Sequence, residues 1–149
     1  MSDLVEDLEY NRKLKEVLHI YNVSLKNNKG LETIRNFIKS AVDYYDYVIE
    51  LFLEREYKNN KINEIPKTPI ERYNLFLHLI NDKDIENTMI YYKKLRTCLN
   101  SHITIQNEYR KTMIIVCKGY ETENKLTIKD IKDIIENIRK FSNLIVKYI

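Results

Sequence analysis

The chain is poor in residues that interrupt regular structure, since its 149 residues include only two glycines and two prolines, and it has no tryptophan. So few breakers favour long helices over the many tight turns of an all-β fold. Two glycines are too few for a glycine-rich phosphate loop or a dinucleotide fingerprint, and the sequence contains neither HExxH nor GxSxG. The common nucleotide, metalloprotease and hydrolase motifs are therefore absent, and we expect neither a metal nor another cofactor.

Only two cysteines occur, Cys98 and Cys117, and they form no CxxC pair and have no histidine pair at zinc spacing. We expect two half-buried thiols in a reducing cell. Residues 1–10 are acidic and polar, unlike a secretory signal peptide. The longest apolar run, residues 113–117, is far too short to span a membrane. These features predict a cytoplasmic protein without a membrane contact.

The remaining composition is that of a globular protein, with 44% hydrophobic and 32% charged residues. The length fits one domain covering residues 1–149. The net charge of +3 is too small to indicate nucleic-acid binding by itself.

Hydrophobic periodicity predicts six helices, joined by short connections that favour antiparallel neighbours in an all-α bundle of about five to six helices. They cover roughly residues 3–21, 31–57, 69–80, 84–99, 105–116 and 127–149. The second has the widest apolar stripe, which is typical of a central helix contacted from two sides. Thr68 and Thr127 are expected N-caps. Residues 113–116 could instead form a short buried strand, but no partner strand is apparent.

One pair of residues could carry chemistry. Arg96 falls on the inward stripe of the fourth helix, where a guanidinium needs either a ligand or an acidic partner on a neighbouring helix. His102 follows six residues later, so the two side chains meet only if the helix ends or bends near Asn100 and Ser101, which are weak helix formers.

The surroundings of this pair are basic and contain tyrosines that could stack on bases. We take as candidate nucleic-acid ligands Lys93, Lys94, Arg110, Lys111, Lys118, Tyr92 and Tyr109. Such a cluster is equally typical of an ordinary solvated face.

The segment from Lys93 to His102 resembles the HEPN superfamily (higher eukaryotes and prokaryotes nucleotide-binding domains), whose motif is an arginine, four to six residues, then a histidine. The resemblance implies a helical bundle and a metal-independent endoribonuclease of a toxin or antiviral defence system, acting as a dimer. It assigns Arg96 to the scissile phosphate and gives His102 a general acid or base role, which suits an imidazole titrating near neutral pH. Thr97 departs from the usual Asn, Asp or His after the arginine.

A second alignment places residues 109–120 on the same family segment, with Cys117 where the histidine belongs; the domain would then bind RNA without cleaving it. Two other functions remain open. The chain could be a non-enzymatic protein-interaction module, such as an adaptor, a viral or phage inhibitor of host defence, or a small subunit of a nucleoprotein complex. It could also bind nucleic acid non-specifically through the basic residues alone.

Overall fold

The computed structural model describes residues 3–108 and 110–149. Its elements in chain order are α1 (Asp3–Glu6), α2 (Leu8–His19), the π-helix η1 (Ile20–Ser24), α3 (Leu25–Asn27), α4 (Leu31–Lys58), α5 (Pro69–Ile80), α6 (Lys83–Asn87), α7 (Tyr92–Leu99), β1 (His102–Gln106), β2 (Ile114–Lys118), β3 (Glu123–Thr127) and α8 (Ile128–Ile145). No helix in these described ranges is long and apolar enough to cross a membrane.

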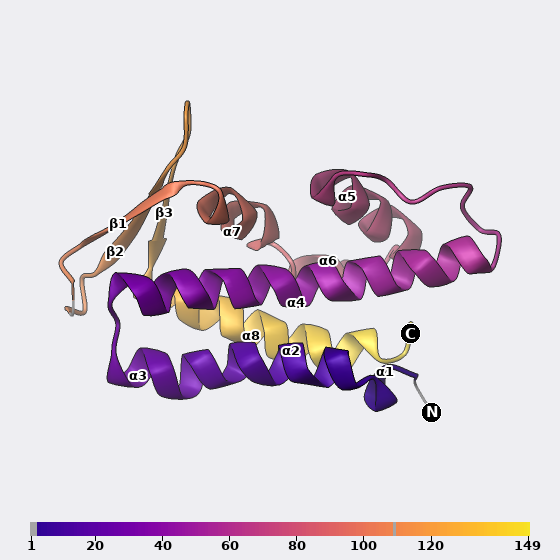
Figure 1. The fold of residues 1–149 in the computed structure, drawn as a ribbon, viewed down its shortest axis with the longest axis horizontal. Coiled ribbons are helices and arrows are strands. Elements are labelled where there is room, and N and C mark those ends of the chain that lie inside the picture. The colour runs from indigo at the N-terminus through magenta and orange to yellow at the C-terminus, as the bar shows by residue number, and fades with distance from the viewer. Residues whose placement is uncertain (1–2, 109) are drawn as a thin grey trace.

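Helix α4 is the central element, as its wide apolar stripe predicts. Helices α2 and α3 lie along one side of it, while α5, α7 and the sheet lie on the other (Figure 1). An aromatic cluster joins these layers, because Tyr45 of α4 contacts both Tyr92 of α7 and Phe141 of α8 edge-to-face. The predicted caps are also confirmed: the Thr68 hydroxyl accepts from the Glu71 N–H, and Thr127 forms a capping box with Asp130.

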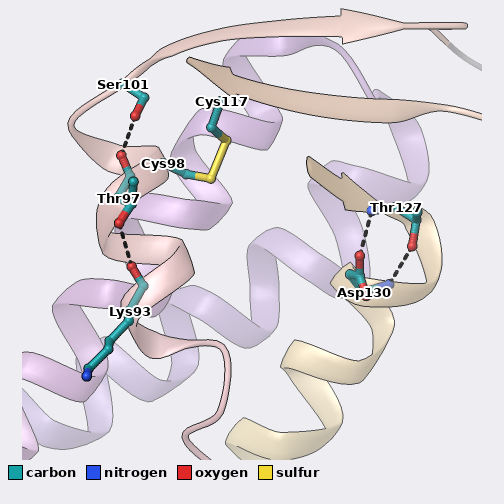
Figure 2. Close-up of a disulfide and its surroundings, with 7 residues drawn as sticks. All are labelled: Lys93, Thr97, Cys98, Ser101, Cys117, Thr127 and Asp130. Atoms are coloured by element: carbon teal, nitrogen blue, oxygen red, sulfur yellow. Dashed lines mark hydrogen bonds between the residues drawn. A yellow bond between two sulfur atoms is a disulfide. The ribbon is translucent and has the colours of Figure 1, made fainter. Parts of the chain in front are cut away.

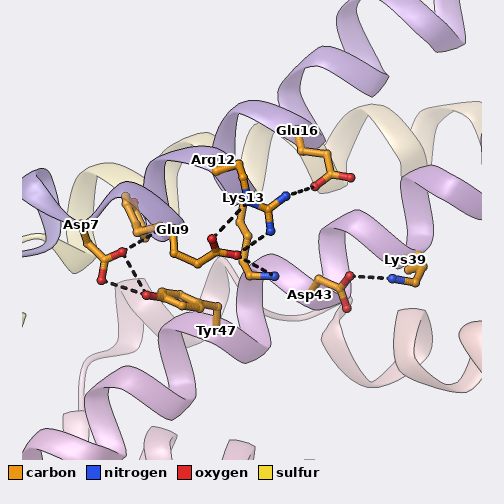
Figure 3. Close-up of polar contacts among 9 residues, drawn as sticks. Asp7, Glu9, Arg12, Lys13, Glu16, Lys39, Asp43 and Tyr47 are labelled. Atoms are coloured by element: carbon orange, nitrogen blue, oxygen red, sulfur yellow. Dashed lines mark hydrogen bonds and ion pairs between the residues drawn. The ribbon is translucent and has the colours of Figure 1, made fainter.

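Polar contacts fix the register of α2 against α4 (Figure 3). The Tyr47 hydroxyl donates to the carboxylate of Asp7 at 2.9 Å, and Asp7 is also the N-cap of α2. The Lys13 ammonium lies 5.8 Å from the centre of the Tyr47 ring. These contacts hold the start of α2 on the middle of α4, so the N-terminal helix belongs to the same packed unit as the rest of the chain.

The predicted all-α bundle is wrong between residues 102 and 127. This segment forms a three-stranded antiparallel sheet of order β1-β2-β3, so the fold is mixed α and β. The predicted helix over 105–116 is replaced by a hairpin whose loop includes Asn107 in the left-handed region. The alternative strand predicted at 113–116 does form, as β2 over Ile114–Lys118, with β1 and β3 as its partners. The segment is rich in isoleucine, valine and threonine, and these β-branched residues lose less side-chain freedom in a strand than in a helix.

The sheet has one buried face and one face toward solvent. The buried face meets α4, α7 and α8 and carries Ile103, Ile105, Ile115, Cys117 and Leu126. The other face, which we call the outer sheet face, carries His102, Thr104, Gln106, Ile114, Val116, Lys118, Glu123, Lys125 and Thr127, of which Val116 in the middle strand is buried. Because successive side chains of a strand point to opposite faces, the strand register alone decides on which face each residue lies.

Candidate nucleic-acid interface

Arg96 lies on the face of α7 that contacts α4, and it already has partners there. Its Nη2 forms an ion pair with Asp46 of α4, and its Nε donates to the Tyr92 hydroxyl at 3.1 Å. The Tyr92 hydroxyl donates to the other carboxylate oxygen of Asp46. Only 17% of the Arg96 side chain and 22% of the Asp46 side chain are exposed. The alternative in which Arg96 reaches an acid of a neighbouring helix therefore describes this structure.

Burial shifts the pKa of two of these residues, Tyr92 and Asp46. It raises the pKa of the Tyr92 hydroxyl, and the hydrogen bond to Asp46 raises that pKa further. Burial also raises the pKa of Asp46, against the opposing effects of the Tyr92 hydrogen bond and of the Arg96 charge. Tyr92 therefore stays protonated at neutral pH and acts as a donor. Its ring is stacked on Tyr73 at 4.6 Å and is completely buried, so it cannot stack on a base in this structure.

Helix α7 ends at Leu99, where the sequence predicts a break. The Ser101 hydroxyl donates to the carbonyl of Thr97 at 2.5 Å, and the Thr97 hydroxyl donates to the carbonyl of Lys93 at 2.9 Å (Figure 2). The Ser101 N–H donates to the carbonyl of Cys98 at 3.1 Å, which tightens the last turn. The chain can therefore leave the helix and enter β1 directly at His102.

His102 is exposed on the outer sheet face, where it lies opposite Lys118 in the strand register. Residues opposite one another in this way have Cβ atoms about 5 Å apart. Cys117, which precedes Lys118 in β2, points to the buried face of the sheet, which α7 covers. Arg96 of α7 faces α4. The break after Leu99 thus forms, but it does not turn the imidazole back toward Arg96. The cation beside His102 is Lys118.

The two cysteines are bonded, which corrects the prediction of two half-buried free thiols. Cys98 of α7 and Cys117 of β2 form a disulfide with their Cα atoms 5.0 Å apart, and both are completely buried (Figure 2). The bond ties the end of α7 to the middle strand of the sheet. In the second family alignment Cys117 takes the place of the catalytic histidine, yet here it faces the core and cannot meet a ligand.

The remaining candidate ligands differ in their accessibility. Lys93 is exposed at the start of α7 and Lys94 is half-buried. Arg110 and Lys111 are exposed in the loop between β1 and β2. Tyr109 lies outside the described residues. Tyr120 was not a candidate, although it is completely exposed at the turn between β2 and β3.

The sequence did not reveal two contacts near the candidate residues. These are the ion pair of Arg96 with Asp46 and the disulfide between Cys98 and Cys117. Asp46 is one of several acidic residues of α4, and its partner depends on how α7 packs there. The pairing of the cysteines depends on the hairpin that replaced the predicted helix. Among residues 3–108 and 110–149 no cluster of three potential metal ligands occurs. Comparisons with models of protein families, with characterised proteins and with solved structures find no match.

Proposed function

We propose that this chain binds single-stranded RNA on the outer sheet face. The observation that supports this most is the exposed row of His102 and Lys118, placed side by side by the strand register. Lys125 lies diagonally from Lys118 on the same face. It comes two residues after Glu123, the residue of β3 that lies opposite Lys118. These two ammonium groups and the imidazole outnumber the one carboxylate of the face, that of Glu123, and suit the phosphates of a flexible strand.

The charge of this region exceeds that of the whole chain. From Lys93 to Lys125 the sequence carries seven lysines and arginines but only three glutamates, whereas the full chain has a net charge of +3. Arg96 is neutralised by Asp46, yet the other six cations have no ion-pair partner among the described residues. The excess of positive charge therefore faces solvent, where it can attract a polyanion.

Tyr120 adds an exposed aromatic ring, which a surface made only of charged groups lacks. The Gly119 N–H donates to the carbonyl of Thr122 at 2.9 Å and closes the turn on which Tyr120 stands, completely exposed. This turn extends away from the helices (Figure 1). An exposed aromatic ring beside a lysine can stack on a base while the lysine holds the adjacent phosphate.

Replacing Lys118 is expected to weaken RNA binding and its dependence on salt. Lys118→Ala should lower the magnitude of the slope of log K against log salt by about 0.7, the value for one phosphate contact on a single strand. The measurement is fluorescence anisotropy with a labelled single-stranded RNA at several salt concentrations. Lys61→Ala is the matched control, because Lys61 is exposed in the linker after α4, at the opposite end of the molecule.

Equal losses in the Lys118 and Lys61 variants would contradict the proposed surface. Salt-independent association with another protein and no association with RNA would instead support the protein-interaction module.

The position of His102 favours one further activity, metal-independent cleavage of the bound strand as in the HEPN resemblance. His102 would take the proton of a ribose 2′-hydroxyl, whose oxygen attacks the adjacent phosphorus. The bond from phosphorus to the 5′ oxygen breaks, and that oxygen receives the proton from His102. Lys118 would stabilise the charge on the phosphate oxygens. Arg96 would act as a positioning residue, since it holds α7 on α4.

His102→Ala is expected to lower the rate of RNA cleavage in the presence of chelator by about 100-fold or more, the usual contribution of a general base. Cleavage is followed by gel electrophoresis of end-labelled RNA. His78→Ala is the control, because His78 is exposed on α5, far along the chain from this surface. Wild-type rates in the His102 variant would remove the assignment, while intact binding without any cleavage would leave the RNA-binding proposal standing.

The proposal places the chain in the cytoplasm, where RNA is available. A disulfide is unusual in that reducing compartment. The complete burial of both sulfurs limits the access of cellular thiols to the bond. A protein partner or a second copy of the chain would, under this proposal, bind on the outer sheet face in addition to RNA.

A further inference from the structure

Helix α3 and the starts of α4 and α8 lie at one end of the molecule (Figure 1). A cavity of about 200 Å³ is lined there by residues of η1, α3, α4 and α8, by Lys29 and by Met113, which precedes β2. It shares no residue with the outer sheet face. Its lining consists of Tyr21, Leu25, Lys26, Lys29, Ile34, Met113, Ile128 and Ile131. The residues come from segments far apart in the sequence, so the cavity is a product of the tertiary structure.

The walls of the cavity are apolar. Leu25, Ile34 and Met113 are at least 95% buried, and they contribute only hydrocarbon and thioether surface. A short π-helix forms one wall: it contains Tyr21, and the Leu25 N–H at its end donates to the carbonyl of Ile20, five residues earlier. Single π-helical turns cost stability relative to an α-helix and are found mostly at functional sites. This turn is therefore a second feature that marks the cavity as a binding site.

The rim of the cavity is positively charged. Lys26 and Lys29 both line it and are both exposed. Neither forms an ion pair with a described residue, and no carboxylate belongs to the lining. The ligand that fits has an apolar body for the walls and a negative head for the two ammonium groups.

We propose that this cavity binds a carboxylate with an unbranched apolar chain, of the class of medium-chain fatty acids. The volume lies below the roughly 300 to 1,000 Å³ of sites for drug-sized molecules, which selects a short chain over a large ring system. The carboxylate lies between Lys26 and Lys29, and the chain replaces water against Leu25, Ile34 and Ile131. Burial of the chain supplies most of the affinity, and the lysines select the charged head.

Calorimetric titration with octanoate, octan-1-ol and acetate tests the two parts of this site. Octanoate is expected to bind with one site per chain, octan-1-ol about tenfold more weakly, and acetate not measurably. The Lys26→Ala/Lys29→Ala variant should lose about tenfold in affinity for octanoate and keep its affinity for octan-1-ol. Lys58→Ala/Lys61→Ala is the matched control at the other end of α4 and should bind octanoate like the wild-type protein.

The place where octanoate binds is tested independently of its affinity. Octanoate should shift the methyl resonances of Ile34, Ile128 and Ile131, but not those of Ile62 and Ile90, in a spectrum of the isoleucine-labelled full chain. Equal affinities for octanoate and octan-1-ol, shifts spread over the whole molecule, or binding only where octanoate forms micelles would each overturn the proposal. These results do not depend on RNA binding, so the two proposals fail separately.

Discussion

Reduction of the Cys98–Cys117 disulfide is expected to lower the free energy of unfolding by about 3 kcal/mol. The bond joins residues 19 apart in sequence, and the loop that it closes contains β1 and the loop leading into β2. Without the bond the unfolded chain gains the entropy of opening that loop, while the folded chain loses the link between α7 and the sheet. Urea unfolding followed by tyrosine fluorescence, with and without a dithiol reductant, measures the difference.

The control for this experiment is the Cys98→Ala/Cys117→Ala variant, whose unfolding midpoint should not respond to the reductant. Thiol labelling of the unreduced protein in denaturant provides the second measurement, since both sulfurs are occupied by the bond. Two labelled thiols per chain before reduction would show that the bond does not form in solution. In that case the original expectation of free cysteines would be correct, and both thiols would be buried side by side.

The second large effect is expected at Asp46. Asp46→Ala should lower the free energy of unfolding by about 3 kcal/mol, because it leaves the Arg96 guanidinium and the Tyr92 hydroxyl without their shared acceptor in a largely buried site. Asp43→Ala is the matched control three residues earlier on α4. Asp43 pairs with Lys39 one turn away at an exposed site, where such pairs contribute about 0.3 to 0.5 kcal/mol.

A double-mutant cycle separates the ion pair from the rest of the packing. Adding Arg96→Met to Asp46→Ala removes the unpaired charge. The free energy of unfolding lost in the double variant should therefore be smaller than the sum of the two single losses, by about 1 kcal/mol or more. If Asp46→Ala cost no more than Asp43→Ala, the triad would be a surface contact of little consequence. Arg96 would then be free to reach a phosphate, as the HEPN resemblance implies.

The loss of stability expected for Asp46→Ala affects how variants of Arg96 are interpreted. An arginine that stabilises the fold cannot be replaced without disturbing α7, so loss of RNA cleavage in an Arg96 variant would not by itself identify a ligand contact. His102 and Lys118 are exposed, and no ion pair joins either of them to another residue in the described part of the chain. Their variants therefore report on binding and chemistry more directly than any variant of Arg96.

The sequence by itself determined most of the helices. The period of apolar residues in α4 and the caps at Thr68 and Thr127 are local signals, because the groups that satisfy them lie within one helical turn. The end of α7 was equally local, since Asn100 and Ser101 favour a cap over continuation. These elements could be predicted without any knowledge of what packs against them.

Only the tertiary structure decided the sheet and the candidate site. A short run of β-branched residues fits a buried strand or a buried helix, and the choice depends on strand partners that lie 5 to 16 residues away in sequence. That choice placed His102 beside Lys118 and joined Cys98 to Cys117, whereas the packing of α7 on α4 turned Arg96 toward Asp46. The strand register and the packing of α7 on α4 are properties of long-range pairing, and hydrophobic periodicity carries no information about which distant segments pair.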